Sequence, residues 1–258
     1  MGQKINYDYN SDGKKIFLLY PHSVIRDNLL DTLIMAGFET YTLVDEKKAR
    51  NLLTKFPDSI LFINIDAGLK ENEWERYIHS IREDPKTIGS RIGIMSYNQD
   101  EELMRKYLID LSIPCGYIQL KLGLMESTKI ILSALEANEA RGRRKFIRAD
   151  CRDDIHASLN FKEESGLYRG KLMDISSSGV TAKFDGLIDF PPKSMLRDVQ
   201  LRVRGGLLLS DMIMAGTRHD DRNVCIMLFG SKLSSEEKAI IHRYVKICLQ
   251  KYIDELKL

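Results

Sequence analysis

The sequence contains little of what marks cross-linked, membrane-spanning or strongly charged proteins. Its four cysteines stand far apart, without the spacing of a metal site or of a disulfide framework. No apolar run approaches the roughly 20 residues that a membrane-spanning helix needs. Lys and Arg together number 39 and Asp and Glu 37, so the formal net charge is only +2. The sequence therefore indicates neither a membrane span nor a general electrostatic attraction to nucleic acid.

What is present is an ordinary composition for a globular protein. Apolar residues make up 43% of the 258 positions and charged residues 29%, which is enough for two domains that each have a hydrophobic core. Residues 1–14 are polar and lack the apolar segment of a signal peptide, so we predict a polar N-terminal tail and a cytoplasmic protein. Any basic function must then come from a local cluster of charge.

Residues 15–138 alternate between short apolar runs and amphipathic stretches. The stretch that follows the first run has a helical period, and Ser23 can cap this helix while Gly37 can end it. The apolar runs are predicted to be strands, at 15–20, 39–44, 59–65, 91–97 and 115–120. Five successive strand and helix pairs predict an α/β fold, a doubly wound parallel sheet with helices on both faces.

Residues 148–258 have a different rhythm, and residues 139–147 form the expected linker before them. Six short strand-like runs, separated by Gly, Pro, Asp and Asn, predict a small antiparallel barrel or sandwich. The chain ends with a helical stretch in which Ser234 and Glu237 have the spacing of a capping box. We expect its apolar stripe to pack on the barrel or a neighbouring domain; the stripe comprises Ile241, Val245, Cys248 and Tyr252.

The five strand and helix pairs of the first half resemble the receiver domain of response regulators. That resemblance implies acidic residues at the ends of the first and third strands, where a magnesium ion and a phosphorylated Asp lie. Here Tyr20, Pro21 and His22 follow the first strand in place of the acidic pair. Asn64 stands near the phosphoacceptor position, and Asp66 follows two residues later. The carboxylates that would bind magnesium are therefore not clustered.

Two other receiver positions are filled. Ser96 and Lys121 stand where the family has a Ser or Thr and a Lys that contact the phosphoryl group. We predict a degenerate receiver-like domain that is not phosphorylated and holds no metal; the alternative is a phosphorylation-dependent regulator that uses Asp66. The five histidines are scattered through different elements, so we predict no catalytic residues and expect that the protein is not an enzyme.

A basic stretch, RGRRKFIRAD, spans residues 141–150 at the junction of the two halves. It contains the pattern R-x-x-x-R as Arg144 and Arg148, and an overlapping copy as Arg148 and Arg152. Taken alone, the stretch is compatible with a solvated linker, a nucleic-acid patch or a clamp for one particular anion. The pattern is therefore a weak signal until a second motif is found.

That second motif is DISSSG, which places Asp174, Ser176 and Gly179 in the order D-x-S-x-x-G at the end of a predicted strand. R-x-x-x-R followed by D-x-S-x-x-G resembles the PilZ domain, the bacterial receptor module for cyclic di-GMP. The resemblance covers residues 141 to about 250 and implies a β-barrel, rather than a sandwich, with a terminal helix. It also implies cyclic di-GMP as the ligand.

The position of an aromatic residue selects the arginines of the first motif. The family has an aromatic residue between its two arginines, and here Phe146 lies between Arg144 and Arg148. Arg143, directly before the motif, resembles family members that take up a stacked dimer of the ligand. Members with an apolar residue at that position bind one molecule, and the number of ligand molecules is left open here.

Cyclic di-GMP carries two phosphodiester anions and two guanines, which suit these side chains. The guanidinium groups of Arg144 and Arg148 can pair with phosphate or with guanine O6 and N7, and can stack on a purine. The Asp174 carboxylate can accept hydrogen bonds from guanine N1–H and N2–H₂, and Ser176 adds a hydroxyl contact. Gly179 removes a side chain where the backbone must turn or approach the ligand closely.

Together these patterns predict an effector that binds cyclic di-GMP and needs no cofactor. The ligand would order the segment from Arg141 to Arg148 and change the domain arrangement, which a protein partner would sense through the first domain. Motility and envelope regulation are candidate outputs. The alternative is a nucleic-acid-binding regulator, but the balanced charge and the absence of a helix-turn-helix pattern favour no specific nucleic-acid partner.

Overall fold

The computed structural model of the protein describes residues 13–164, 166–186, 188–230 and 233–257. The chain divides into two compact units, Met1–Lys145 with Ile253–Leu258, and Phe146–Tyr252. The polar tail predicted at residues 1–14 lies outside the described residues except at its last two positions. Within the described part of the chain, no helix has both the length and the apolar composition that crossing a membrane requires.

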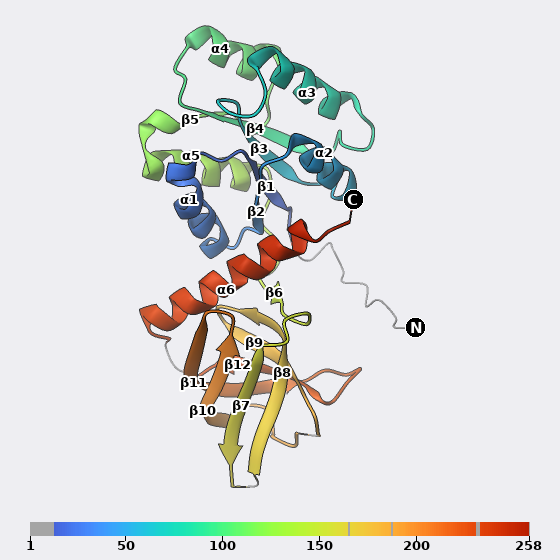
Figure 1. The fold of residues 1–258 in the computed structure, drawn as a ribbon, viewed down its shortest axis with the longest axis vertical. Helices are drawn as coiled ribbons and strands as arrows, with labels where there is room; N and C mark the ends of the chain where they lie inside the picture. The colour runs from blue at the N-terminus through green and yellow to red at the C-terminus, as the bar shows by residue number, and fades with distance from the viewer. Residues whose placement is uncertain (1–12, 165, 187, 231–232, 258) are drawn as a thin grey trace. The chain divides into compact units, whose positions relative to one another are not determined.

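The first unit contains a five-stranded parallel sheet (Figure 1). Its strands are β1 (Ile16–Leu19), β2 (Thr40–Leu43), β3 (Ile60–Asn64), β4 (Arg91–Ser96) and β5 (Tyr117–Gln119). They lie in the order β2-β1-β3-β4-β5. Every residue of β1 and β3 is buried, and all of them except Asn64 are apolar, as expected for central strands of a parallel sheet. The doubly wound sheet predicted from the sequence is confirmed.

A helix follows each strand of this sheet. The helices are α1 (Ser23–Met35), α2 (Glu46–Lys55), α3 (Glu71–Glu83), α4 (Glu101–Arg105) and α5 (Leu124–Ala137). Helix α4 continues as a π-helical turn over Lys106–Asp110, and a 3-10 turn over Leu120–Leu122 precedes α5. Helices α1 and α5 share one buried core with the sheet, in which Leu29 and Ile131 meet strand residues such as Phe62.

The start of α1 differs from the expectation drawn from the sequence. His22, and not Ser23, is the capping residue, and its Nδ1 accepts a hydrogen bond from the N–H of Val24 at 3.3 Å. Ser23 is already the first helical residue, so its side chain does not cap the first turn. The helix ends as predicted before Gly37, whose φ of 89° is in the left-handed region that favours glycine.

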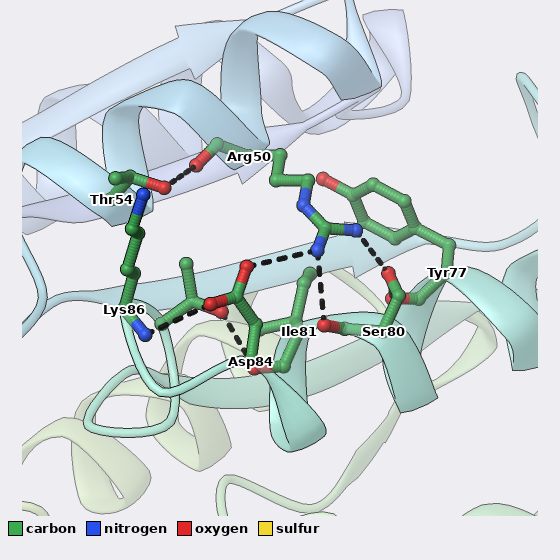
Figure 2. Close-up of polar contacts among 8 residues, drawn as sticks. Arg50, Thr54, Tyr77, Ser80, Ile81, Asp84 and Lys86 are labelled. Atoms are coloured by element: carbon green, nitrogen blue, oxygen red, sulfur yellow. Dashed lines mark hydrogen bonds and ion pairs between the residues drawn. The ribbon is translucent and has the colours of Figure 1, made fainter.

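One arginine joins α2 to α3 (Figure 2). Arg50 Nη1 donates to the Ser80 hydroxyl at 2.6 Å, and its Nη2 donates to Asp84 Oδ2 at 3.0 Å and to the Ser80 carbonyl oxygen at 3.3 Å. Asp84 also accepts a hydrogen bond from the N–H of Lys86 at 2.9 Å. The bond from Lys86, followed by the bond from Arg50, holds the pKa of Asp84 below its usual value.

We expect Arg50→Ala to lower the midpoint of thermal unfolding of the first unit by about 2–8 °C. The substitution removes every guanidinium bond to Ser80 and Asp84, while alanine preserves the helix propensity of α2. Trp74 of α3 is the single tryptophan, so its fluorescence reports on this unit. Lys47→Ala is the matched control, because Lys47 is exposed on the same helix. Equal shifts in the two variants would contradict the prediction.

The second unit is a closed antiparallel barrel with one helix (Figure 1). Its elements are β6 (Ala149–Asp150), β7 (Ser158–Glu163), β8 (Gly166–Ser176), β9 (Gly179–Phe184), β10 (Met195–Val203), β11 (Gly206–Thr217), β12 (Val224–Phe229) and all but the last two residues of α6 (Ser235–Asp254). Six strands pair in the order β8-β7-β10-β11-β12-β9, and β9 pairs with β8 to close the barrel. The short strand β6 pairs with the end of β8. The predicted barrel is confirmed.

Helix α6 begins where the sequence predicts. The N–H of Ser234 donates to Glu237 Oε2 at 2.7 Å, and the N–H of Glu237 donates to Ser234 Oγ at 3.2 Å, which completes the expected capping box. Ile241 and Val245 of the predicted apolar stripe are buried, but Tyr252 is 40% exposed. A tyrosine tolerates this position because its hydroxyl end can stay in water.

Candidate functional site

Arg148 and Asp174, one from each predicted motif, lie next to each other in the second unit. Strand β6 begins directly after Arg148 and pairs with β8, where Asp150 lies opposite Asp174. Arg148 Nη1 is 3.4 Å from Asp174 Oδ1, although the two residues are 26 positions apart in the chain. The side chain of Asp174 is 14% exposed and that of Arg148 is 39% exposed. The contact is therefore accessible from the arginine side.

A residue outside both motifs orients the Asp174 carboxylate. The hydroxyl of Thr181 in β9 donates to Asp174 Oδ1 at 3.0 Å, and Thr181 is almost fully buried. Across β8 and β9 the two residues are direct partners, next to a register shift that follows Leu172. The sequence held a signal for this contact, because a tight hairpin that pairs Ser176 with Gly179 also sets position 174 opposite position 181. Thr181 was nevertheless not predicted from the sequence.

Ser176 and Gly179 belong to the hairpin that joins β8 to β9. Ser176 is buried, and its Oγ lies 3.0 Å from Ser178 Oγ and 3.3 Å from the Gly179 carbonyl oxygen. A Cβ on Gly179 would lie 2.2 Å from the carbonyl oxygen of Met227 in β12, which is too close for any side chain. Both residues therefore contribute to the packing of the barrel, in addition to the ligand contacts that the motif predicts.

The stretch before the motif arginines is held by the first unit. Ala140 is buried, and its carbonyl oxygen accepts a hydrogen bond from the N–H of Lys14 at 3.0 Å. Arg141 Nη1 donates to the Ala36 carbonyl oxygen at 2.9 Å, and its guanidinium lies 4.9 Å from the centre of the Phe38 ring. Ala140 and Arg141 are therefore fastened to the first unit, although both lie in the linker expected at residues 139–147.

The R-x-x-x-R pattern spans the division between the two units. Arg143 and Arg144 are exposed and lie in the first unit, which reaches Lys145. Arg148 lies in the second unit, which begins at Phe146. The structure therefore brings Arg148 together with Asp174 of the second motif, whereas Arg143 and Arg144 belong to the first unit.

A row of apolar side chains across three strands leads to the hairpin of the second motif. Gly179 is paired with Leu228 of β12, Leu228 with Ile213 of β11, and Ile213 with Met195 of β10. Leu228 is 41% exposed and Met195 is 50% exposed, so the row lies on the outer surface of the barrel. Sequence reasoning missed these residues because pairing across three strands is not visible along the chain. The row offers a flat aromatic ring an apolar surface beside the motif.

In the first unit, hydrogen bonds hold Asn64, the residue that the resemblance to receiver domains predicted near a phosphoacceptor position. Asn64 donates from Nδ2 to the Tyr20 carbonyl oxygen at 2.8 Å. Tyr20 has a left-handed backbone with φ of 52°, and its hydroxyl donates to Glu46 Oε2 at 2.8 Å. Burial, together with the bond to Glu46, raises the pKa of Tyr20 to about 12, so this hydroxyl stays protonated at neutral pH. These bonds fasten the end of β1 to β3 and α2.

Asp66 joins the ends of β3 and β4. Its Oδ1 accepts a hydrogen bond from the Ser96 hydroxyl at 2.5 Å, and its Oδ2 accepts one from the N–H of Tyr97 at 2.7 Å. Ser96 Oγ accepts a bond from the N–H of Asn98 at 2.9 Å. Lys121 is exposed in the 3-10 turn after β5. Across the described residues, no three His, Cys, Asp or Glu side chains come together as a metal site would require.

We expect acetyl phosphate and magnesium not to phosphorylate Asp66. Both carboxylate oxygens already accept hydrogen bonds, and a phosphoryl group would have to break them without a cluster of carboxylates to position magnesium. The intact mass after incubation at neutral pH should equal that of untreated protein. Asp66→Ala is the background variant, and a labile adduct found on the wild type but not on Asp66→Ala would establish the phosphorylation-dependent alternative.

Comparison with known proteins finds no matching family model and no matching curated protein. Solved structures do match the C-terminal part of the chain. The PilZ domain of YcgR from Escherichia coli with c-di-GMP matches at 14% identity and a TM-score of 0.37, over 44% of this chain and 99% of that chain. The Bacillus subtilis inhibitor of motility, MotI/DgrA, matches at 15% identity and a TM-score of 0.35, over 44% of this chain and 53% of that chain.

The complex of K. pneumonia MrkH with c-di-GMP matches at 17% identity and a TM-score of 0.34, over 40% of this chain and 51% of that chain. The chain thus spans nearly all of the YcgR PilZ domain but about half the length of MotI and of MrkH. At such identities and TM-scores the matches do not by themselves assign a function. In its C-terminal part the chain is similar to the PilZ domain of YcgR.

Proposed function

We propose that the chain is an effector that binds cyclic di-GMP and has no enzymatic activity. The observation that carries this proposal is the contact between Arg148 of the first motif and Asp174 of the second, at 3.4 Å. Two motifs that meet on one barrel surface are a more specific signal than either motif alone. The proposed ligand residues are Arg143, Arg144, Arg148, Asp174, Ser176 and Gly179.

The contact between Arg148 and Asp174 is suited to exchange for a ligand. A partly exposed ion pair at this distance contributes only about 0–1 kcal/mol to stability, so it is easily replaced. Cyclic di-GMP offers Arg148 a phosphate or a guanine edge, and it offers Asp174 the N1–H and N2–H₂ donors of guanine. Thr181 holds the carboxylate while its other partner changes. We therefore expect the ligand to bind with little rearrangement of the barrel.

The apolar row on the barrel surface supports the same placement. Leu228 lies opposite Gly179, and Ile213 and Met195 continue the row away from the hairpin. A purine base that lies against partly exposed Leu228 and Met195 would remove apolar surface from water, which favours binding. The row thus complements the polar contacts of the motif with a surface for one base.

The proposed output is a change in domain arrangement. Arg144 belongs to the first unit and Arg148 to the second, so a ligand that engages both would restrict motion at the short connection between them. The contacts of Ala140 and Arg141 would carry that restriction into the receiver-like unit. The part of the linker that the ligand reorganises is then shorter than the full segment from Arg141. A protein partner would sense the change through this unit, with motility or envelope regulation as candidate settings.

Isothermal titration calorimetry of the intact chain with cyclic di-GMP tests the proposal. We expect saturable binding at micromolar ligand, and the stoichiometry separates one ligand molecule from a stacked dimer that Arg143 helps to hold. The linear dinucleotide pGpG is the control ligand, because it has the same bases without the closed ring. Duplex DNA at two salt concentrations tests the nucleic-acid alternative, whose affinity would fall steeply with salt. The proposal would be rejected if titration with micromolar cyclic di-GMP gave no heat of binding.

A further inference from the structure

Two of the four cysteines meet beside the candidate site, although they are far apart in sequence. Cys151 directly follows β6, its N–H donates to the Met173 carbonyl oxygen at 2.9 Å, and its side chain is 1% exposed. Its Sγ lies 3.4 Å from the carbonyl oxygen of Ala149. Cys248 lies on α6 and is partly exposed. Both residues belong to the second unit.

Helix α6 is fastened to the turn that contains Cys151. The N–H of Asp154 donates to the Cys151 carbonyl oxygen at 3.0 Å, which closes the turn. The hydroxyl of Tyr244 on α6 donates to Asp154 Oδ2 at 2.8 Å. Cys248 follows Tyr244 by four residues, so it lies on the same face of the helix one turn later. The helix thereby presents Cys248 to Cys151.

Cys151 and Cys248 affect each other's acidity, and they do so in opposite directions. A hydrogen bond from Cys151 lowers the pKa of Cys248, whereas the same bond and burial raise the pKa of Cys151. The other two cysteines have no such partner among the causes of their pKa shifts. Burial raises the pKa of Cys225 to about 11, and it is the main cause that raises the pKa of Cys115 to about 11. The pair thus combines Cys248, whose pKa is lowered, with Cys151, whose pKa is raised.

We propose that Cys151 and Cys248 are a redox modification site, at which a peroxide converts the two thiols into a disulfide. The Cys248 thiol gives up its proton, and the thiolate attacks one oxygen of hydrogen peroxide to become a sulfenic acid. The O–O bond breaks, and the other oxygen leaves as hydroxide, which takes up the released proton to form water. The Cys151 sulfur then attacks the Cys248 sulfur, the S–O bond breaks, and the proton of Cys151 leaves with the second water. The two thiols lose two electrons, and the peroxide is reduced to two water molecules.

The disulfide would act on the candidate ligand site. Cys151 stands three residues after Arg148, and Asp150 between them is paired with Asp174. A covalent link from Cys151 to α6 would hold the end of β6 and limit the freedom of Arg148 to turn from Asp174 to a ligand. This consequence rests on the proposed function, whereas formation of the disulfide does not.

Thiol counting and peptide mapping on the full chain test the disulfide. Treatment of the reduced wild type with hydrogen peroxide should remove two of its four thiols and yield linked peptides that contain Cys151 and Cys248. Cys248→Ser should form no such link, and this variant is preferred to Cys151→Ser because Cys151 is fully buried. Cys115→Ser is the control and should still lose two thiols. Four thiols that survive in the wild type, or a link through Cys225, would overturn the proposal.

Calorimetry on the reduced and oxidised wild type tests the consequence for the ligand. We expect oxidation to weaken cyclic di-GMP binding by the wild type, and reductant to restore the original affinity. The affinity of Cys248→Ser should be the same before and after oxidation. Equal affinities of the two forms, with the disulfide present, would refute the coupling to Arg148. No binding in either form would count against the proposed function and leave the thiol result standing.

Discussion

Replacing Arg148 or Asp174 by alanine is expected to weaken cyclic di-GMP binding about 10- to 150-fold. Each substitution removes one charge-assisted contact, which is worth about 1.5–3 kcal/mol, and a factor of ten corresponds to about 1.4 kcal/mol. Arg148→Ala loses the partner for phosphate or guanine, and Asp174→Ala loses the acceptor for guanine donors. Calorimetry on the intact chain gives both affinities. The stability of Arg148→Ala should change little, because the ion pair is partly exposed and long in the free protein. Asp174→Ala should lose about 1–3 kcal/mol, because the buried Thr181 hydroxyl loses its acceptor.

Two further variants show which residues carry the effect. Arg152→Ala is the matched control, since Arg152 belongs to the overlapping R-x-x-x-R pattern and forms an ion pair with Asp150. It should bind the ligand like the wild type. Thr181→Val should weaken binding less than Asp174→Ala, because it removes only the hydroxyl that orients the carboxylate. Loss of binding in Arg152→Ala, with Arg148→Ala unaffected, would contradict the assignment of the motif.

Gly179→Ala is expected to destabilise the barrel by about 3 kcal/mol, the upper end of what overpacking usually costs. The new Cβ would lie 2.2 Å from the Met227 carbonyl oxygen and 2.9 Å from the Leu228 Cα, and neither is the flexible end of a side chain. Strands β9 and β12 would have to separate where Gly179 pairs with Leu228. Far-UV circular dichroism during thermal unfolding measures this loss.

Gly186→Ala is the control for this substitution, because a Cβ on Gly186 meets nothing within 4 Å. Fluorescence of Trp74, in the first unit, should not shift in either variant if the damage is confined to the barrel. A stable Gly179→Ala protein that has lost only its ligand would show that this glycine serves close approach of the ligand, as the motif predicts, and not strand packing.

Much of the fold could be predicted from the sequence because its signals are local. Continuously apolar runs such as the one in β3 identify buried parallel strands, and the capping box at Ser234 and Glu237 places the start of α6. The cap of α1 was mispredicted because the local sequence allows either of two neighbouring residues to be the cap. Ser23 and His22 are neighbours, and only backbone dihedrals decide which of them precedes the helix.

The candidate site was predictable only in part. The motif order pointed to Arg148 and Asp174, but nothing along the chain shows that β6 folds against β8 and brings them together. Thr181 was inferable from the register of one hairpin. The apolar row that ends at Leu228 was not, since it depends on pairing among four strands.

The sequence by itself determined the two-part organisation, the strand and helix rhythm of each part, and the chemistry of the motif side chains. These are properties of residue type and spacing, which the chain carries before it folds. Only the tertiary structure decided that Gly179 is needed by β12 and that Cys248 meets Cys151. Each of these contacts joins residues whose distance depends on strand register and helix docking, and neither is encoded in any short stretch of sequence.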